Sequence, residues 1–472
     1  MTVLCPPPRD PRRGGHDRPR PGRGNTRHGA PAVNRCYNGG MRVMLCDPPN
    51  ASRAAVSPAV PVHPMALGYL AAALSPGHDV RQLVPDIRAR DGTPAWDDVE
   101  AELAAFQPEL VGITAVTHSF PAALQLAALA KRACPRTTVV LGGPHASARP
   151  ASAFACPDVD GVVVGEGEVT LRALADGANP IGLPGTWWRG DDGRPVPGPA
   201  RAPVDDLDTI AFPRRDGVLW SDDVHPAFYQ SIITLRGCPY ACIYCAVPSL
   251  DDRKTRYRSP ANVLDEIQFL RDQYQVPYLF FHDSVFTLNR KRTEAILHGM
   301  IERHLDVPFC CQTRVDRVDG PLLSLMRRAG CHQVFYGIES GHPETLRRMK
   351  KAVPLSQARE AVRLTLAEGI RASGFFMVGF PWETEAHLDA TAEFATSIGL
   401  EALSLFSATP LPGTELERLS GVTAPPDVDF RRPEVNLTAL PAARYIEMYQ
   451  SLVSRFTLYN QDVSLRSSWP RG

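Results

Sequence analysis

The sequence has no net charge, no long hydrophobic run and almost no lysine. Its 51 Lys and Arg residues are balanced by 51 Asp and Glu residues, and only five of the basic residues are lysines. A neutral chain does not attract nucleic acid or a membrane surface through its overall charge. No run of apolar residues is long enough for a transmembrane helix, and no apolar signal-peptide core lies near the N-terminus. We therefore expect a cytoplasmic protein without a nucleic-acid or membrane partner.

The 11 cysteines do not form the framework of a small disulfide-bonded secreted domain, which favours a reducing compartment. Three of them, Cys238, Cys242 and Cys245, lie together in the stretch Leu235–Ala246. By chance this spacing is expected about 0.006 times per chain. Thiolates so spaced can point toward one centre, and cysteine thiolates hold iron–sulfur clusters. A 4Fe-4S cubane normally takes four ligands, so three leave one iron open, as catalytic zinc sites leave one position free.

Two other interpretations of this loop are a zinc site and three free thiols. Zinc sites usually combine two Cys-x-x-Cys pairs, or one such pair with two histidines, and the sequence has no second pair. A fourth cluster ligand from Cys310, Cys311 or Cys331 would instead make the protein an electron carrier. Cys310 and Cys311 are adjacent on a predicted strand, so only one of them can face the interior. We expect both to be buried as small apolar residues.

The pattern Cys-x-x-x-Cys-x-x-Cys, with the aromatic Tyr244 before the last cysteine, resembles the radical S-adenosylmethionine (SAM) superfamily. The resemblance extends over residues 41–415. It implies that the open iron binds the amino and carboxylate groups of the methionine part of SAM, and that one electron from the cluster then cleaves SAM to a 5′-deoxyadenosyl radical. It also places Tyr244 near the SAM adenine and implies an external electron donor of the flavodoxin or ferredoxin type.

Residues 1–40 are rich in Arg, Gly and Pro, and we expect them to be a disordered basic tail or the product of a misplaced start codon. A nucleic-acid-binding arm is the alternative, but the segment lacks the aromatic groups that stack on bases. From Met41 onward strand and helix patterns alternate, which predicts a parallel α/β sheet over residues 41–180. In such sheets ligands bind at the carboxyl ends of the strands.

The predicted strand ends of this first domain are rich in glycine and polar residues. They resemble the cobalamin-binding domain that precedes many radical SAM cores, in which a Met-Ala-Leu-Gly-Tyr-Leu helix, a Gly-Gly-Pro-His turn and a Gly-Glu-Gly-Glu strand end recur. The glycines allow close approach of the backbone to a ligand. The resemblance implies cobalamin-binding residues at these ends, namely Thr117, His118, Gly142, Gly143, His145, Gly165, Glu166 and Gly167.

One motif of some cobalamin proteins, Asp-x-His-x-x-Gly, does not occur, and prolines follow Asp47. In those proteins the histidine of the motif ligates cobalt from below. Bound cobalamin is therefore expected to lack this lower ligand, and a domain that had lost cobalamin would show the same absence. His63, His118 and His145 lie nearest the predicted cleft. We expect them to line it or to form hydrogen bonds rather than to ligate cobalt.

Three further segments complete the predicted organisation. Residues 181–230 are expected to form a linker with a small hairpin around Trp187. Residues 231–415 contain six predicted strands with five intervening helices, an incomplete barrel that matches the radical SAM core. Residues 416–472 form a C-terminal extension with a helix at about Ala442–Phe456. The predicted fold class is α/β: a Rossmann-like (flavodoxin-like) cobalamin-binding domain, a partial (β/α)6 radical SAM barrel and a short helical C-terminal extension.

The carboxyl ends of the barrel strands are expected to carry the chemistry. Arg314 can offer a charged fork to a carboxylate. Glu339 and Ser340 stand in a Gly-Ile-Glu-Ser-Gly motif, and Gly379 opens a Gly-Phe-Pro-Trp-Glu turn. For each polar side chain the alternative is a cap or loop hydrogen bond. The resemblance implies SAM-binding roles for Tyr244, Asp283, Arg314, Glu339, Ser340 and Gly379.

The leading hypothesis is a cobalamin-dependent, class B radical SAM methyltransferase that acts on a small molecule in natural-product biosynthesis. The resemblance implies that the 5′-deoxyadenosyl radical takes hydrogen from an unactivated carbon, and that the substrate radical then receives a methyl group from methylcobalamin, which a second SAM remethylates. A second hypothesis keeps these cofactors but predicts a rearrangement, cyclisation or ring contraction. A third is a non-enzymatic cobalamin and iron–sulfur redox sensor. The residues do not identify the substrate.

Overall fold

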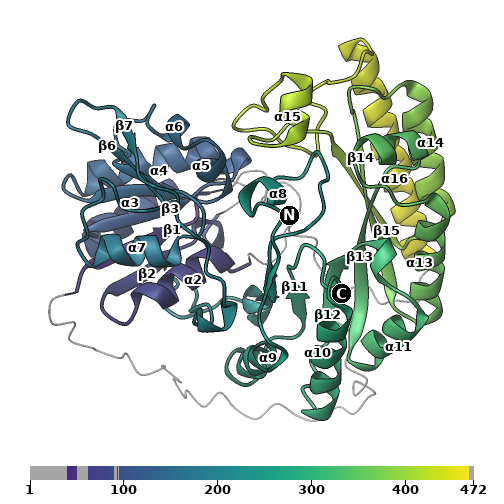
Figure 1. The fold of residues 1–472 in the computed structure, drawn as a ribbon, viewed down its shortest axis with the longest axis horizontal. Coiled ribbons are helices and arrows are strands. Elements are labelled where there is room, and N and C mark those ends of the chain that lie inside the picture. Colours follow the sequence, from purple (N-terminus) through teal and green to yellow (C-terminus); the bar gives the residue numbers. More distant parts are fainter. Residues whose placement is uncertain (1–39, 50–61, 90–92, 94, 467–472) are drawn as a thin grey trace, which may run out of the picture.

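The computed structural model describes residues 40–49, 62–89, 93 and 95–466, so nearly all of the predicted basic tail lies outside it. Two α/β domains follow one another along the chain, the first drawn in purple to blue and the second in green to yellow (Figure 1). Within the described residues, none of the helices combines the length and the apolar content needed to cross a membrane.

The first domain is built on a seven-stranded sheet of order β2-β1-β3-β4-β5-β6-β7. Its five parallel strands follow the 2-1-3-4-5 order of flavodoxin-like folds, and this confirms the predicted class. Short apolar runs form β1, β3, β4 and β5, which are buried on both faces because helices cover both sides, whereas the edge strand β2 carries Asp79 and Arg81. The parallel strands are β1 (Arg42–Cys46), β2 (Asp79–Leu83), β3 (Leu110–Thr114), β4 (Thr138–Gly142) and β5 (Gly161–Val163).

Helices lie on both faces of this sheet. On one face α2 (Met65–Leu74) and α7 (Glu168–Ala175) pack side by side. On the other face α3 (Trp96–Phe106) and α4 (Phe120–Ala133) form a second apolar core. Two short helices, α5 (Pro144–Ala148) and α6 (Pro150–Ala153), follow the carboxyl end of β4.

The hairpin that we predicted within a linker is instead part of the first sheet. It consists of β6 (Thr186–Arg189) and β7 (Pro195–Pro197), and β6 pairs antiparallel with β5. The reason is local: Gly161 of β5 leaves space for the ring of Trp188, which a side chain at position 161 would overlap. The sequence shows the turn but not the strand beside which the hairpin lies.

The second domain contains a six-stranded parallel sheet of order β15-β14-β13-β12-β11-β8. Helices alternate with the strands, and in the described chain β8 and β15 are the two edges, so the barrel is incomplete, as predicted. The strands are β8 (Ser231–Ile232), β11 (Leu279–Phe281), β12 (Phe309–Thr313), β13 (Cys331–Glu339), β14 (Arg371–Val378) and β15 (Ala402–Ser407). The helices between them are α9 (Pro260–Tyr274), α10 (Arg290–Glu302), α11 (Gly320–Arg328), α13 (Leu355–Ala367) and α14 (Glu385–Ser397).

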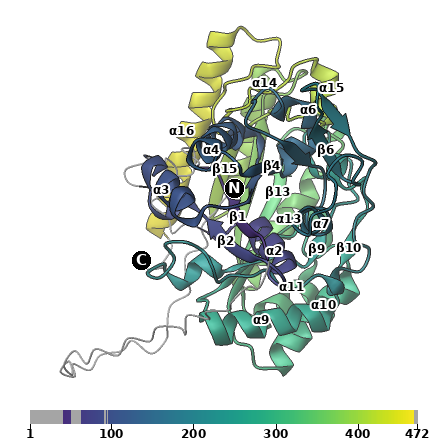
Figure 2. The ribbon, with the colours of Figure 1, turned by 90° about the vertical axis from the view of Figure 1, so that its left-hand side faces the viewer.

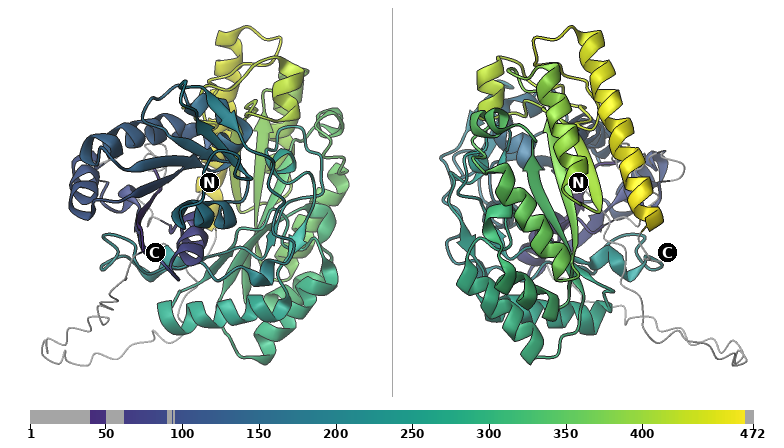
Figure 3. Two further views of the ribbon diagram at one scale, coloured as in Figure 1. Left: turned by 60° about the vertical axis from the view of Figure 1, so that its left-hand side comes forward. Right: turned by 90° about the vertical axis from the view of Figure 1, so that its right-hand side faces the viewer.

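The helices cover the outer face of this sheet, and an aromatic cluster covers its inner face. The right-hand view of Figure 3 shows the helical layer, with α16 (Ala442–Arg466) as its last member. This helix packs against α14 and β15 and is ten residues longer than the predicted Ala442–Phe456. Cys310 lies in the inner cluster and Cys311 in the outer one, and both are fully buried, as the strand alternation predicted.

Five short elements that follow the linker were not predicted. The first strand of the barrel ends after two residues, and β9 (Leu235–Arg236) then pairs antiparallel with β10 (Arg256–Tyr257). The others are the short helices α8 (Val247–Leu250), α12 (Pro343–Arg348) and α15 (Glu415–Ser420). Segments this short carry too little periodicity to be recognised in a sequence.

A buried ion pair fixes the linker between the two domains. Nη2 of Arg215 lies 2.9 Å from Oε1 of Glu266 on α9, and neither side chain is exposed. Arg258 donates to the other oxygen of Glu266, and Arg215 also donates to the carbonyl of Ser231 (2.8 Å). Charges removed from water must be paired, so this pair holds the domains in one arrangement. Figure 2 shows the first domain standing in front of the second sheet.

Candidate functional site

The cysteine loop runs from β9 to α8, and its backbone requires a glycine at its start. Gly237 has a φ of 89°, and a Cβ there would overlap the carbonyl oxygen of Lys254. Both the left-handed conformation and the close contact exclude other residues. The chain turns at Gly237 directly into Cys238.

The middle of the loop is anchored in an apolar cluster. Ile243 is buried there against Met349, Phe380 and Leu416. Its N–H donates to the carbonyl of Met349 (3.2 Å), and its carbonyl accepts from the N–H of Leu416 (2.8 Å). The segments that follow β13 and β15 therefore hold the loop in place.

The three thiols affect one another electrostatically. Cys238 is buried, while Cys242 and Cys245 are half-buried. Burial raises the pKa of Cys245 to about 11, and the charges of Cys242 and Cys238 add to the rise. In the described residues no three His, Cys, Asp or Glu side chains converge closely enough to hold a single metal ion. A cubane of four irons spaces its thiolates more widely than one tetrahedral ion does.

Asp283 binds the segment that leads into the cysteine loop. Its side chain is 1% exposed, and its Oδ1 accepts from the backbone N–H groups of Thr234 (2.7 Å) and Leu235 (3.1 Å). Its Oδ2 accepts from the hydroxyl of Thr234 at 2.5 Å. We expected a contact to SAM at this position. In the structure these hydrogen bonds all support the strand that leads into the cysteines, as the alternative of a loop hydrogen bond predicts.

Arg314 lies beside the cysteine loop with one nitrogen unused. Its guanidinium stacks on the ring of Tyr240 at 3.8 Å and is held by Asp316 (Nε–Oδ1, 2.8 Å; Nη2–Oδ2, 2.9 Å). Nη2 also donates to the carbonyl of Lys351. Nη1 is buried and has no hydrogen-bond partner among the described residues. A buried donor without a partner is costly, so this atom is suited to an anionic ligand.

Glu339 stands at the end of β13 in a strained conformation. Its φ is 74°, a value that costs a non-glycine residue energy and clusters at functional sites. Its carboxylate is paired with Nζ of Lys351 at 3.0 Å, and both side chains are at most 10% exposed. Burial, together with the charge of Glu339, raises the pKa of Tyr244 well above its usual value. Glu339, Lys351 and Tyr244 therefore form one polar group next to the cysteines.

Ser340 and Gly379 serve the packing around this group. The Ser340 hydroxyl is fully buried, bonds to the hydroxyl of Thr391 (3.1 Å) and accepts from the N–H of His342. Gly379 has a φ of 101°, and a Cβ there would overlap the hydroxyl of Tyr445 on α16. The buried hydroxyl of Ser340 and the absence of a side chain at Gly379 are thus explained by the fold.

The carboxyl edge of the first sheet gathers Thr117, His118 and His145. His145 stacks on Phe120 at 4.0 Å, and its Nδ1 lies 3.2 Å from the hydroxyl of Thr117. Burial lowers the pKa of His145 to about 4, and Arg149 adds to the effect. The ring of His118 lies 5.6 Å from that of Phe430 in the second domain. His63 is buried elsewhere, against Gln82 of β2 (2.9 Å).

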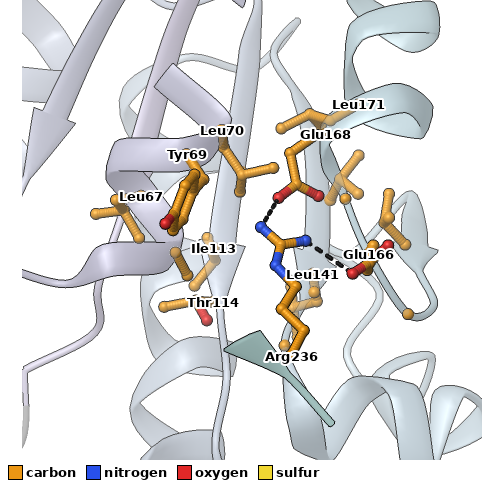
Figure 4. A pocket seen from close by; sticks show the side chains of 18 of the residues that line it. Leu67, Tyr69, Leu70, Ile113, Thr114, Leu141, Glu166, Glu168, Leu171 and Arg236 are labelled. Carbon is orange, nitrogen blue, oxygen red and sulfur yellow. Dashed lines mark hydrogen bonds and ion pairs between the residues drawn. The ribbon is translucent and has the colours of Figure 1, made fainter. Parts of the chain in front are cut away.

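A pocket of about 260 Å³ opens between α2, α7 and strands β3 to β5 (Figure 4). Its walls are apolar, with Leu67, Leu70 and Leu171 from the two helices and Ile113 and Leu141 from the strands. The predicted strand-end residues line its rim, namely Gly142, Gly143, Gly165, Glu166 and Gly167. At Gly165, where φ is 79°, no described atom lies within 4 Å of the place a Cβ would occupy.

Arg236 closes one side of this pocket, although it belongs to the second domain. Its guanidinium binds Glu166 (2.8 Å) and Glu168 (2.6 Å), and Arg256 also binds Glu166. Burial alone would raise the pKa of Glu166, but the hydrogen bonds from Arg256 and Arg236 lower it. Sequence reasoning did not find Arg236 or Lys351. The position of Arg236 directly before Gly237 and Cys238 was the available signal.

Two family models match the chain. The radical SAM superfamily matches residues 232–395, and the B12 binding domain matches residues 54–175. The first range contains the cysteine loop, and the second contains most of the residues that line the pocket.

Three curated proteins illustrate the similarity of the whole chain. An uncharacterized methyltransferase of Pyrococcus horikoshii is 32% identical over 384 residues, which cover 80% of this chain and 82% of that protein. Cytidylyl-2-hydroxyethylphosphonate methyltransferase of Streptomyces wedmorensis is 27% identical over 414 residues (75% and 77%). Anaerobic magnesium-protoporphyrin IX monomethyl ester cyclase of Rubrivivax gelatinosus is 29% identical over 366 residues (75% and 65%).

Solved structures share the fold. The radical S-adenosylmethionine methyltransferase TsrM from Kitasatospora setae, with cobalamin and a 4Fe-4S cluster bound, gives a TM-score of 0.68 at 24% identity, covering 82% of this chain and 80% of that one. The cobalamin-dependent S-adenosylmethionine radical enzyme OxsB gives 0.62 at 19% identity, covering 80% and 55%.

Proposed function

Because the chain belongs to the cobalamin-binding, methyltransferase-like radical SAM enzymes, we propose that it transfers a methyl group from cobalamin to an unactivated carbon atom of a small molecule. One observation carries this proposal: Arg236 lines the pocket of the B12 binding domain and lies two residues before Cys238 of the radical SAM domain. The two cofactor regions are therefore adjacent, as a reaction that uses both of them requires.

Cys238, Cys242 and Cys245 are the proposed cluster ligands. Three thiols on one anchored loop fit a cluster with one open iron. When bound, the cluster supplies the electron that cleaves SAM, and cobalamin supplies the methyl group. Since burial raises the pKa of Cys238 and Cys245, these thiols release protons when they bind iron. The reducing electron is proposed to come from a donor of the flavodoxin or ferredoxin type.

Arg314, Glu339 and Tyr244 are proposed to hold SAM. The unpartnered Nη1 of Arg314 suits the carboxylate of SAM. The strained backbone of Glu339 turns its carboxylate toward Lys351 and Tyr244, where it can accept a hydrogen bond from the ligand. Gly379 contributes through its backbone only. Asp283 and Ser340 act indirectly, since their oxygens bind the chain itself.

The apolar pocket is the proposed site for part of cobalamin. Its walls suit the flat, apolar base of the cobalamin nucleotide, and the glycines at its rim allow close approach of the larger ring. Thr117, His118 and His145 lie at the same edge of the sheet. His145 is held by Thr117 and Phe120, and its lowered pKa keeps it neutral. We propose that it lines the site rather than binds cobalt.

A second candidate function uses the same cofactors without methyl transfer. The similarity to a cyclase over 75% of the chain favours it. Methylation consumes one SAM for the radical and one for the methyl group, so S-adenosylhomocysteine should form in step with 5′-deoxyadenosine. A cyclisation or rearrangement yields 5′-deoxyadenosine alone. A role in natural-product biosynthesis fits both functions.

The test is anaerobic purification with cobalamin supplied, followed by cobalt content, absorbance and the cobalt(II) electron paramagnetic resonance (EPR) spectrum. Near one equivalent of cobalamin, with a spectrum that lacks coupling to a lower nitrogen, supports the proposal. Protein that cleaves SAM but binds no cobalamin would contradict it.

A further inference from the structure

Arg236 connects the two proposed cofactor regions through one side chain. It is the last residue of β9, and its guanidinium crosses from the second domain into the first (Figure 4). Nη1 lies 2.8 Å from Oε1 of Glu166, and Nη2 lies 2.6 Å from Oε1 of Glu168. The three side chains are 19%, 18% and 10% exposed. These are charge-assisted bonds in a partly buried setting, where such bonds are strongest.

The two carboxylates lie two residues apart, in the stretch that joins β5 to α7. Glu166 lies in the loop after β5, and Glu168 is the first residue of α7. Both line the pocket, and so does Arg236 itself. A ligand in the pocket would remove water from around the two ion pairs. Because charges attract more strongly in a drier environment, the occupied pocket should hold Arg236 more firmly than the empty one.

On its other side Arg236 leads directly to the cysteines. Gly237 follows it, packed under the carbonyl of Lys254, and Cys238 comes next. Arg256 pairs with Arg236 across the β9–β10 ribbon and also binds Glu166, at 2.8 Å. Both strands of the ribbon are thus tied to the same carboxylate. When the first domain holds the guanidinium of Arg236, it therefore also restrains the backbone next to Cys238.

We propose that Arg236 is a positioning residue that couples cobalamin binding to assembly of the cluster loop, so that each cofactor is held more tightly when the other is bound. This inference rests on the proposed function of the two sites. Such coupling is reciprocal, and its usual size is about 5-fold to 150-fold in affinity. The cluster-loaded protein should therefore bind cobalamin at least about fivefold more tightly than the cluster-free protein.

Hydroxocobalamin titrations of the full-length protein test this, with and without anaerobically reconstituted cluster. The affinity ratio should fall to near one in Arg236→Met. It should be intermediate in Arg236→Lys, because an ammonium group lacks the fork that spans both carboxylates, and in Glu168→Gln, which leaves only the ion pair with Glu166. Glu100→Gln removes an exposed pair with Arg132 in the same domain and should leave the ratio unchanged. In cluster-free protein, hydroxocobalamin should slow amide hydrogen exchange over residues 237–246, and the slowing should be smaller in Glu168→Gln and absent in Arg236→Met.

The outcomes separate this inference from the proposed function. Equal affinity of the two wild-type forms for hydroxocobalamin would overturn the coupling alone, and so would a ratio that survives in both Arg236→Met and Glu168→Gln. Wild-type protein that binds no cobalamin in either form would overturn the proposed function and the coupling with it. If Arg236→Met does not fold, Glu168→Gln decides, because that change lies outside the second domain and keeps a hydrogen-bonding side chain.

Discussion

Glu383 gives a prediction of stability against pH. Its side chain is 1% exposed, and Oε2 accepts from the N–H groups of Gly379 (2.7 Å) and Phe380 (3.0 Å). Burial raises its pKa from 4.5 to about 7 despite these bonds. The folded protein therefore binds this proton more tightly than the unfolded chain does. The contribution of Glu383 to stability is fully present below pH 4.5 and is lost as the pH rises through 7.

The size of the effect follows from the rise of the Glu383 pKa from 4.5 to about 7, since a tenfold change in proton affinity corresponds to about 1.4 kcal/mol. The full loss is about 3 kcal/mol, and about 2 kcal/mol of it falls between about pH 5.5 and 8.5. Glu383→Gln keeps an oxygen for the two N–H groups and removes the proton equilibrium. The variant should therefore lack this loss. The other titrating groups, including the buried histidines, are the same in both proteins. Their contributions to the pH dependence therefore cancel when the stability of the variant is subtracted from that of the wild type.

Urea unfolding at several pH values between 5.5 and 8.5 measures this difference. The wild type should lose about 2 kcal/mol relative to Glu383→Gln as the pH rises. Glu385→Gln is the matched control, because this nearby carboxylate is exposed and paired with Arg444, which lowers its pKa. Parallel stability profiles of the wild type and Glu383→Gln would refute the assignment of the raised pKa to Glu383.

Three further variants test the site. Gly237→Ala should fold but lose most of its iron, since a Cβ overlaps the Lys254 carbonyl; wild-type iron content would contradict the described loop. Arg314→Met should weaken SAM binding about tenfold or more, the usual worth of a hydrogen bond between charged groups. Arg317→Met, which removes a hydrogen bond and a ring contact to Tyr240 and a charge near Asp316, should not. Cys245→Ala should lose the cluster absorbance, and Cys310→Ala, buried in the inner aromatic cluster, should keep it.

The sequence predicts the fold well because both domains repeat one simple unit. Helix Trp96–Phe106 and helix Met65–Leu74 lie where apolar periodicity and flanking breakers indicate a helix. The cysteine loop is equally local: its three cysteines lie within eight residues. The prediction is weaker where the partner is distant in the chain, as for the hairpin Thr186–Pro197, which pairs with β5.

The roles of single strand-end residues are harder to predict. Asp283 and Glu339 both lie at the carboxyl ends of barrel strands, yet Asp283 binds the backbone of Thr234 and Leu235, and Glu339 faces Lys351. A sequence pattern gives the position of a carboxylate but not the direction of its side chain. Arg236 was missed for a related reason. Its partners lie 70 and 68 residues earlier, in another domain, and only the folded chain brings them together.

The long helix α16 has a consequence for the solution behaviour of the protein. β15 ends the open sheet, and an unpaired edge strand can recruit a strand from another molecule. The side-chain amide of Asn460 on α16 makes the two hydrogen bonds that a neighbouring strand would make to Leu403. Its oxygen accepts from the N–H of Leu403 (2.8 Å), and its nitrogen donates to the Leu403 carbonyl (3.0 Å). Farther along β15, the carbonyl of Phe430 accepts from the N–H of Ser407. The C-terminal extension thus protects this edge from aggregation.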